Sequence, residues 1–131
     1  MKGYVADIEK LTEGNKDFRQ VLYTGAHLQL VVMALDPGQS IGTETHATHD
    51  QFFRIEKGNG AALIDGVTHQ VKDGDCIIAP AGAVHNLTNT GDKPLLLYTV
   101  YGPPNHIDHL VQKTKADAEA SDETFDGVAT E

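Results

Sequence analysis

The chain has 131 residues, a formal net charge of −9 and a single cysteine, Cys76. This length fits about one ordinary domain, which can bury a core without disulfides, so we expect Cys76 to be a small buried apolar residue. The acidic balance, without clustered Lys and Arg, argues against a nucleic-acid partner. No apolar stretch approaches the ~20 residues of a membrane span, and Asp7 and Glu9 interrupt any secretory signal. We therefore expect no membrane partner and a soluble cytoplasmic protein.

Taken in chain order, the sequence predicts three parts of one domain. Residues 1–26 form an N-terminal segment with a first strand, residues 27–102 form a barrel, and residues 103–131 form a loop, a short helix and a frayed tail. The middle part alternates turn signals with short apolar runs, which is typical of an all-β sandwich or barrel. Its strand-length runs are residues 28–35, 51–57, 61–64, 67–72, 76–79 and 95–101.

Two local signals are specific. Asp65-Gly66, between two strand-length runs, supplies the positive backbone angles of a two-residue turn and predicts a hairpin. Residues 114–121, rich in Lys, Ala and acids, predict a couple of helical turns. Residues 121–131 contain few apolar side chains, and this composition is the reason for expecting a frayed tail.

A first motif, between Gly38 and Gly58, contains three oxygen or nitrogen donors: Glu44, His46 and Gln51. Glu44 and His46 are two residues apart, so on one strand they point to the same face. Gln51 opens the next apolar run after a short turn. If its side chain points inward, those of residues 53 and 55 do too, while residues 54 and 56 face water. The spacing therefore predicts that the three donors converge.

A second motif reads Gly74-x5-Pro80-x-Gly82-x2-His85-x3-Asn89. The glycines and the proline turn the chain on either side of a short buried strand, residues 76–79, and His85 starts the returning strand. The predicted path brings His85 towards the donors of the first motif.

The spacings of these two motifs resemble those of the cupin superfamily, and the resemblance extends through Gly102. It implies a double-stranded β-helix and one divalent metal ion inside the barrel. The ligands implied are Glu44, His46, Gln51 and His85. Many small cupins are dimers, so the resemblance also implies a homodimer.

Two of these positions depart from the common cupin pattern, because Glu44 replaces a usual His and Gln51 replaces a usual Glu. Two imidazoles and one carboxylate are the ligand set of non-haem Fe(II) sites, so Fe(II) is favoured among Fe, Mn, Ni, Co, Zn and Cu. Gln51 adds only a weak neutral donor. Cupins that linearise unsaturated uronates resemble this pattern in carrying a Gln there.

Alternatives remain open for several residues. His49 is a rival ligand, although its spacing of three from His46 places it on the opposite face of a strand. Gln51 could instead be a buried amide bonded to backbone, and Glu44 a solvated acid at the rim. His106 follows two prolines and is expected in a loop, with a lid over the barrel mouth as the alternative.

Three functions are compatible with the pattern. The first is a metalloenzyme for a small-molecule substrate, either a dioxygenase or a sugar or sugar-acid isomerase, with Phe53, Ile55 and Leu87 lining the site. The second is a non-enzymatic module that binds or senses a sugar or carboxylate. The third is a metal-free structural barrel. No catalytic residue beyond the ligands is identifiable from the sequence.

Overall fold

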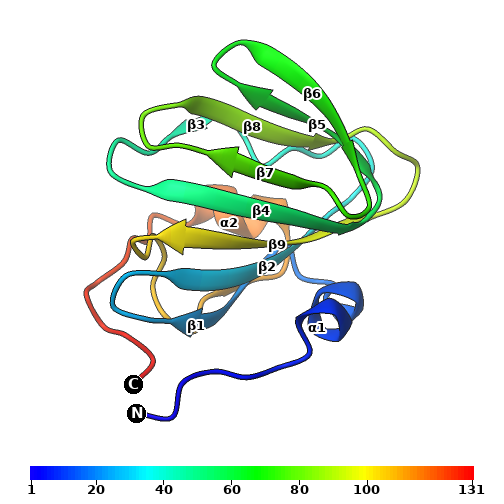
Figure 1. Cartoon of the computed structure of the whole chain (residues 1–131). Coiled ribbons are helices and arrows are strands. Elements are labelled where there is room, and N and C mark those ends of the chain that lie inside the picture. The colour runs from blue at the N-terminus through cyan, green and yellow to red at the C-terminus, as the bar shows by residue number, and fades with distance from the viewer.

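A computed structural model describes all 131 residues of the chain. Two antiparallel sheets face each other and enclose one core, which confirms the all-β double-stranded β-helix (Figure 1). The elements are α1 (Ile8–Gly14), β1 (Arg19–Thr24), β2 (Gln29–Leu35), β3 (Glu44–Thr45), β4 (Asp50–Lys57), β5 (Asn59–Ile64), β6 (Val67–Lys72), β7 (Cys76–Ala79), β8 (Val84–Asn89), β9 (Leu95–Gly102), β10 (Val111–Gln112) and α2 (Lys115–Ala120).

The strand order places the two sequence motifs on facing sheets. One sheet has the order β10-β1-β2-β9-β4-β7 and the other β3-β8-β5-β6. The first motif contributes β3 to the small sheet and β4 to the large one, and the second motif contributes β7 and β8. Donors from both motifs therefore reach the same interior from opposite sides.

Side-chain alternation determines what faces this interior. On β4, Gln51, Phe53 and Ile55 are buried while their neighbours are half-buried or exposed, as the sequence predicts. On β9, Leu97, Thr99 and Tyr101 point inward in the same way and are at most 1% exposed. The inward face is apolar towards one end of the barrel. It is polar towards the other end, where Gln51 and Tyr101 lie side by side as register partners on adjacent strands.

The predicted hairpin and C-terminal helix are both present. β5 and β6 are joined by Asp65 and Gly66, both with positive φ (46° and 82°). Helix α2 begins after Thr114, whose side chain accepts a hydrogen bond from the backbone N–H of Asp117 in a capping box. Helix α1 was not predicted; its start signal is Asp7, whose carboxylate accepts from the N–H of Lys10.

Two expectations are wrong. Cys76 is exposed, because β7 is an edge strand on which residues 77 and 79 alone face the core. The C-terminal segment is not frayed. Glu131 accepts hydrogen bonds from the backbone N–H groups of Lys2 and Gly3, and the N–H of Thr130 donates to the carbonyl of Thr24. The two termini accordingly lie close together in Figure 1.

Candidate metal centre

Glu44, His46 and His85 meet at one end of the barrel. Glu44 on β3 is the register partner of His85 on β8, and His46 follows β3 directly. The Nε2 atom of His46 lies 3.1 Å from Oε2 of Glu44, and Nε2 of His85 lies 3.8 Å from the same oxygen. A hydrogen bond from the N–H of Gly82 to the carbonyl of His46, 2.8 Å long, joins the two motifs at this point.

Gln51 reaches the cluster from the opposite sheet. Its amide Nε2 donates to Oγ1 of Thr99 (3.0 Å), and the Thr99 hydroxyl donates to the carbonyl of Phe52 (2.8 Å). Because the hydroxyl proton is used in that second bond, Oγ1 can only accept from the amide. The amide oxygen of Gln51 must therefore face His85, whose Nε2 lies 3.1 Å away.

The ring of His85 is fixed in the same manner. Its Nδ1 lies 3.2 Å from the carbonyl oxygen of Ala83, which can only accept, so Nδ1 carries a proton. In the neutral imidazole, the lone pair of Nε2 then faces the lone pair of the Gln51 oxygen. His85 is 5% exposed and Gln51 1%, so little water is available to separate them. A cation, either a proton or a metal ion, is needed between these two acceptors.

The donor separations fit a metal ion. Two ligand atoms about 2.1 Å from one ion lie about 3.0 Å apart at a right angle, about 3.4 Å at a tetrahedral angle and about 4.2 Å when opposite. The three donor atoms of Glu44, His46 and His85 all lie within 4.8 Å of one another. The distances from Oε2 of Glu44 to the two imidazole nitrogens, 3.1 and 3.8 Å, fall inside this range. The carbonyl that holds Nδ1 of His85 is the kind of outer partner that orients metal-binding imidazoles.

The charge of Glu44 suits a cation site. Burial alone raises the pKa of its carboxyl group, but the hydrogen bond with His46 and the electrostatic influence of His46 and Arg19 outweigh that effect. The pKa of Glu44 therefore lies below its usual value, and the side chain is a carboxylate at neutral pH. A solvated rim acid would lack these partners.

His49, the rival ligand, does not join the cluster. Its Nε2 lies 3.1 Å from the carbonyl oxygen of Pro104, and its Nδ1 lies 3.1 Å from the hydroxyl of Thr48. Nε2 is therefore engaged by the loop that follows β9, and Nδ1 by the neighbouring residue in the turn before β4. Its ring is 5.8 Å from that of His46, so it packs beside the cluster.

A second chain of hydrogen-bonded polar side chains, which the sequence does not predict, runs from Tyr101 through His106 to Glu123. The hydroxyl of Tyr101 donates to Nε2 of His106 (3.1 Å), and Nδ1 of His106 donates to Glu123 (2.5 Å). Burial raises the pKa of Tyr101 to about 12 and lowers the pKa of His106. Burial also raises the pKa of Glu123, but its hydrogen bonds from His106 and from the backbone of Ile107 leave it lower than usual. The chain is thus phenol, neutral imidazole and carboxylate.

This polar chain adjoins the cluster of Glu44, His46 and His85, because the rings of Tyr101 and His46 pack edge to face with 5.9 Å between centroids. Strand alternation from Leu97 and Thr99 was enough to predict an inward Tyr101. Nothing in the sequence places His106 under the tail, since its partner Glu123 lies 17 residues further on in a segment without periodicity.

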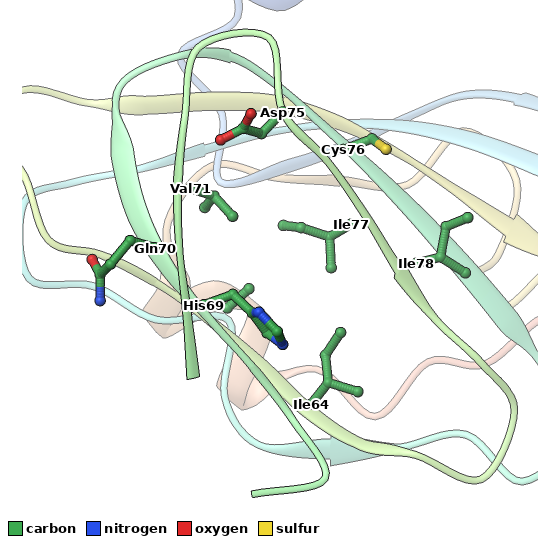
Figure 2. Close-up of a pocket in the computed structure, with 9 residues that line it drawn as sticks. Ile64, His69, Gln70, Val71, Asp75, Cys76, Ile77 and Ile78 are labelled. Atoms are coloured by element: carbon green, nitrogen blue, oxygen red, sulfur yellow. The ribbon is translucent and has the colours of Figure 1, made fainter. Parts of the chain in front are cut away.

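A surface groove has a lining that does not include the clustered donors. It lies between β6 and β7, has a volume of about 380 Å³ and contains the exposed Cys76 at its edge. Figure 2 shows Val71, Ile77 and Ile64 around this space, with Gln70 directed away from it. None of the clustered donors lines it.

The fold and the clustered donors together define a small barrel protein with a possible His and Glu metal site. A family model for the cupin domain matches residues 31–101, and the chain belongs to that family. It is 44% identical over 128 residues to YrkC of Bacillus subtilis, covering 93% of this chain and 69% of that protein.

Solved structures agree with this assignment. The crystal structure of BH2720 from Bacillus halodurans is 40% identical, with a TM-score of 0.90 over 92% of this chain and 96% of that one. A predicted oxalate decarboxylase from Thermotoga maritima is 28% identical, with a TM-score of 0.56 over 57% of this chain and 65% of that one. Neither helix of the present structure has the length and apolar character needed to span a bilayer.

Proposed function

We propose that this cupin is a metal-dependent enzyme that acts on a small molecule inside the barrel. Glu44, His46 and His85 would hold one divalent ion, with Gln51 as a weak fourth donor. The observation that carries the proposal is the pair of facing lone pairs on Gln51 and His85, which the surrounding hydrogen bonds impose and which only a cation relieves.

The ion would supply Lewis-acid or redox chemistry to a substrate oxygen at positions that three protein ligands leave open. The chain supplies the rest. Phe53, Ile55 and Leu87, each at most 3% exposed, keep water from the interior behind the ligands. Tyr101 remains a neutral phenol beside His46, because the Tyr101 pKa is raised to about 12. It can therefore offer or retain a proton at its hydroxyl without adding charge.

Among enzyme classes, two imidazoles and one carboxylate favour an Fe(II) dioxygenase. The Gln at position 51 favours the isomerase class, since the resembling uronate-linearising cupins share it. The Thermotoga maritima relative, described as a predicted oxalate decarboxylase, adds a third small-molecule reaction to test. A binding or sensing module would show metal-dependent ligand binding without turnover.

The test begins with elemental analysis of the chain purified without an affinity tag under anaerobic conditions. We expect about one equivalent of metal in the wild type and less than a tenth of that in His85→Ala and Glu44→Gln. His69→Ala, which removes an exposed imidazole on β6, is the matched control and should retain the ion. Metal content equal in all four proteins, or absent from all, would overturn the proposal.

Turnover is measured next on the loaded protein. Iron together with oxygen uptake on diketones, catechols or thiols would identify a dioxygenase. Zinc, nickel or manganese together with conversion of sugar acids would identify an isomerase. Stabilisation by a metabolite that is recovered unchanged would identify the binding module.

We also propose a cytoplasmic homodimer. The outer face of the large sheet carries an apolar row across four neighbouring strands, with Ile78 opposite Phe52, Phe52 opposite Val100 and Val100 opposite Leu30. Ile78 is 60% exposed. Sedimentation velocity should give twice the chain mass for the wild type and the chain mass for Phe52→Glu, and a wild-type monomer would contradict the proposal.

A further inference from the structure

Arg19 is a buried cation that makes no ion pair. It points into the barrel from β1 and is 6% exposed. Its Nη1 donates to the amide oxygen of Gln112 (2.7 Å), and its guanidinium lies 5.3 Å from the centroid of the Phe18 ring. Neither partner is charged. None of the ion pairs within 4.0 Å anywhere in the chain includes Arg19.

Two of the three guanidinium nitrogens of Arg19 make no hydrogen bond. Nε is fully buried and has no acceptor. Nη2 makes no hydrogen bond either, but it is not fully buried. It therefore retains contact with solvent. Burial of a charge without a paired anion is costly, and a fold that needed only an interior side chain here would be more stable with an apolar one.

The solvent that Arg19 meets is a cleft of about 210 Å³ next to the metal-binding cluster. Arg19, Glu44 and Lys115 line it, together with Phe18, Ile41, Ala118 and Glu119. This volume is below the roughly 300–1,000 Å³ of sites for drug-sized ligands, so the cleft suits a small metabolite. Glu44 is shared, since its carboxylate lines the cleft and also contacts His46.

The charges around the cleft leave room for an anion. Lys115, at the mouth, makes only a 3.5 Å contact with the Ser40 hydroxyl and a 3.8 Å pair with the exposed Glu119. The lining contains two cations and two carboxylates, so its formal charge is zero: Arg19, Lys115, Glu44 and Glu119. A divalent ion on Glu44 would give the cleft an excess of positive charge. Nη2, the guanidinium nitrogen that meets the cleft, has N–H groups that make no hydrogen bond, and a carboxylate oxygen is a strong acceptor for them.

We infer that this cleft is the carboxylate subsite of the enzyme, with Arg19 as the binding residue and Lys115 as a second cation at its mouth. The substrate class is therefore a small carboxylic acid that carries a further oxygen function. The carboxylate lies against Arg19, and the second oxygen is directed towards Glu44, His46 and His85. The second contact rests on the proposed metal centre, whereas the first depends on Arg19 alone.

The experiment is calorimetric titration of the full-length chain with glycolate, lactate and 3-hydroxybutyrate, and with the primary amide of each. Metal content is measured on the same samples, which are loaded with Co²⁺. We expect at least one acid to bind and its amide to bind at least tenfold more weakly. Arg19→Gln should weaken binding of that acid at least tenfold while retaining about one Co²⁺. Arg54→Gln, which removes the same charge from the outer face of β4, should leave the affinity unchanged.

Three results would overturn the inference: equal acid affinity in Arg19→Gln and wild type, equal affinity for acid and amide, or no binding of any acid to the loaded wild type. Lys115→Gln provides a second variant if Arg19→Gln fails to fold, because this half-exposed side chain makes only weak contacts. It should weaken acid binding about threefold, and unchanged affinity would count against the subsite.

Failure of the metal centre is separable from failure of the subsite. If no protein binds Co²⁺, thermal unfolding of the metal-free chain is compared in 50 mM acetate and 50 mM chloride. Stabilisation by acetate in the wild type but not in Arg19→Gln would support the carboxylate subsite alone. Identical shifts in both proteins would overturn it.

Discussion

The docking of the C-terminal segment depends strongly on one carboxylate, that of Glu123. It accepts hydrogen bonds from Nδ1 of His106 (2.5 Å) and from the backbone N–H of Ile107 (2.9 Å), and its side chain is 16% exposed. Glu123→Gln keeps the shape but leaves one oxygen for two donors, so the amide NH₂ must face one of them. A hydrogen bond to a charged group contributes about 1.5–3 kcal/mol.

We expect Glu123→Gln to lower the free energy of unfolding by about 2 kcal/mol at pH 7, since one charged bond is lost and the other becomes neutral. The pKa of Glu123 is lowered in the folded chain, so the carboxylate stabilises the fold above its unfolded pKa and loses this contribution as pH falls through the folded value. The difference between wild type and variant should therefore be complete at pH 7 and shrink below about pH 4.5.

The assay is urea unfolding followed by circular dichroism and tyrosine fluorescence at pH 7, 5.5, 4 and 3. Glu119→Gln is the control, because its side chain is 69% exposed and its pair with Lys115 is long; it should cost less than about 0.5 kcal/mol. A deficit for Glu123→Gln below about 0.5 kcal/mol at pH 7, or one that stays constant down to pH 3, would refute the role given to this carboxylate.

Three further substitutions test the interior. Thr99→Val removes the hydroxyl that orients the amide of Gln51. We expect the metal affinity to fall about 10–100-fold in a competition titration, because residues that hydrogen-bond to metal ligands orient them. Unchanged affinity would count against Gln51 as a ligand. Leu97→Ala, at a fully buried position, should cost about 3 kcal/mol in urea unfolding, against less than about 0.5 kcal/mol for the half-exposed Leu28→Ala. Gly60→Ala would place a Cβ 2.9 Å from a carbonyl oxygen of β8 and should cost about 1–3 kcal/mol, whereas a neutral result would mean that the strand shifts freely.

The sequence predicted side-chain orientation correctly where the alternation of strand side chains between two faces was applied. Alternation along β4 predicted that Gln51, Phe53 and Ile55 face inward, and motif spacing predicted that His85 meets Glu44. The same rule places Cys76 outward on β7, whereas the usual burial of free cysteines predicts a core position.

The polar partners of the site could not be predicted, because their contacts span long sequence distances. Glu123 meets His106 through an irregular segment, and Glu131 meets the other end of the chain. A composition with few apolar residues predicts that a segment lacks a core of its own, but it carries no information about hydrogen bonds to a folded neighbour. Arg19 was inward by alternation with Val21, yet a charged residue in a first strand is ordinarily assigned to the surface.

Most of the polar groups inside this barrel that we have described make hydrogen bonds with one another, and two places do not follow this pattern. We assign the first kind a structural role and the second kind a functional one. The amide of Gln51, the imidazole of His106 and the hydroxyl of Thr99 each have partners that fix their orientation. The facing acceptors of Gln51 and His85, and the free N–H groups of Arg19, have none. The first place presents two acceptors and the second presents donors. Since apolar replacements would remove both costs, two such places in one interior support the proposed metal centre and the proposed carboxylate subsite together.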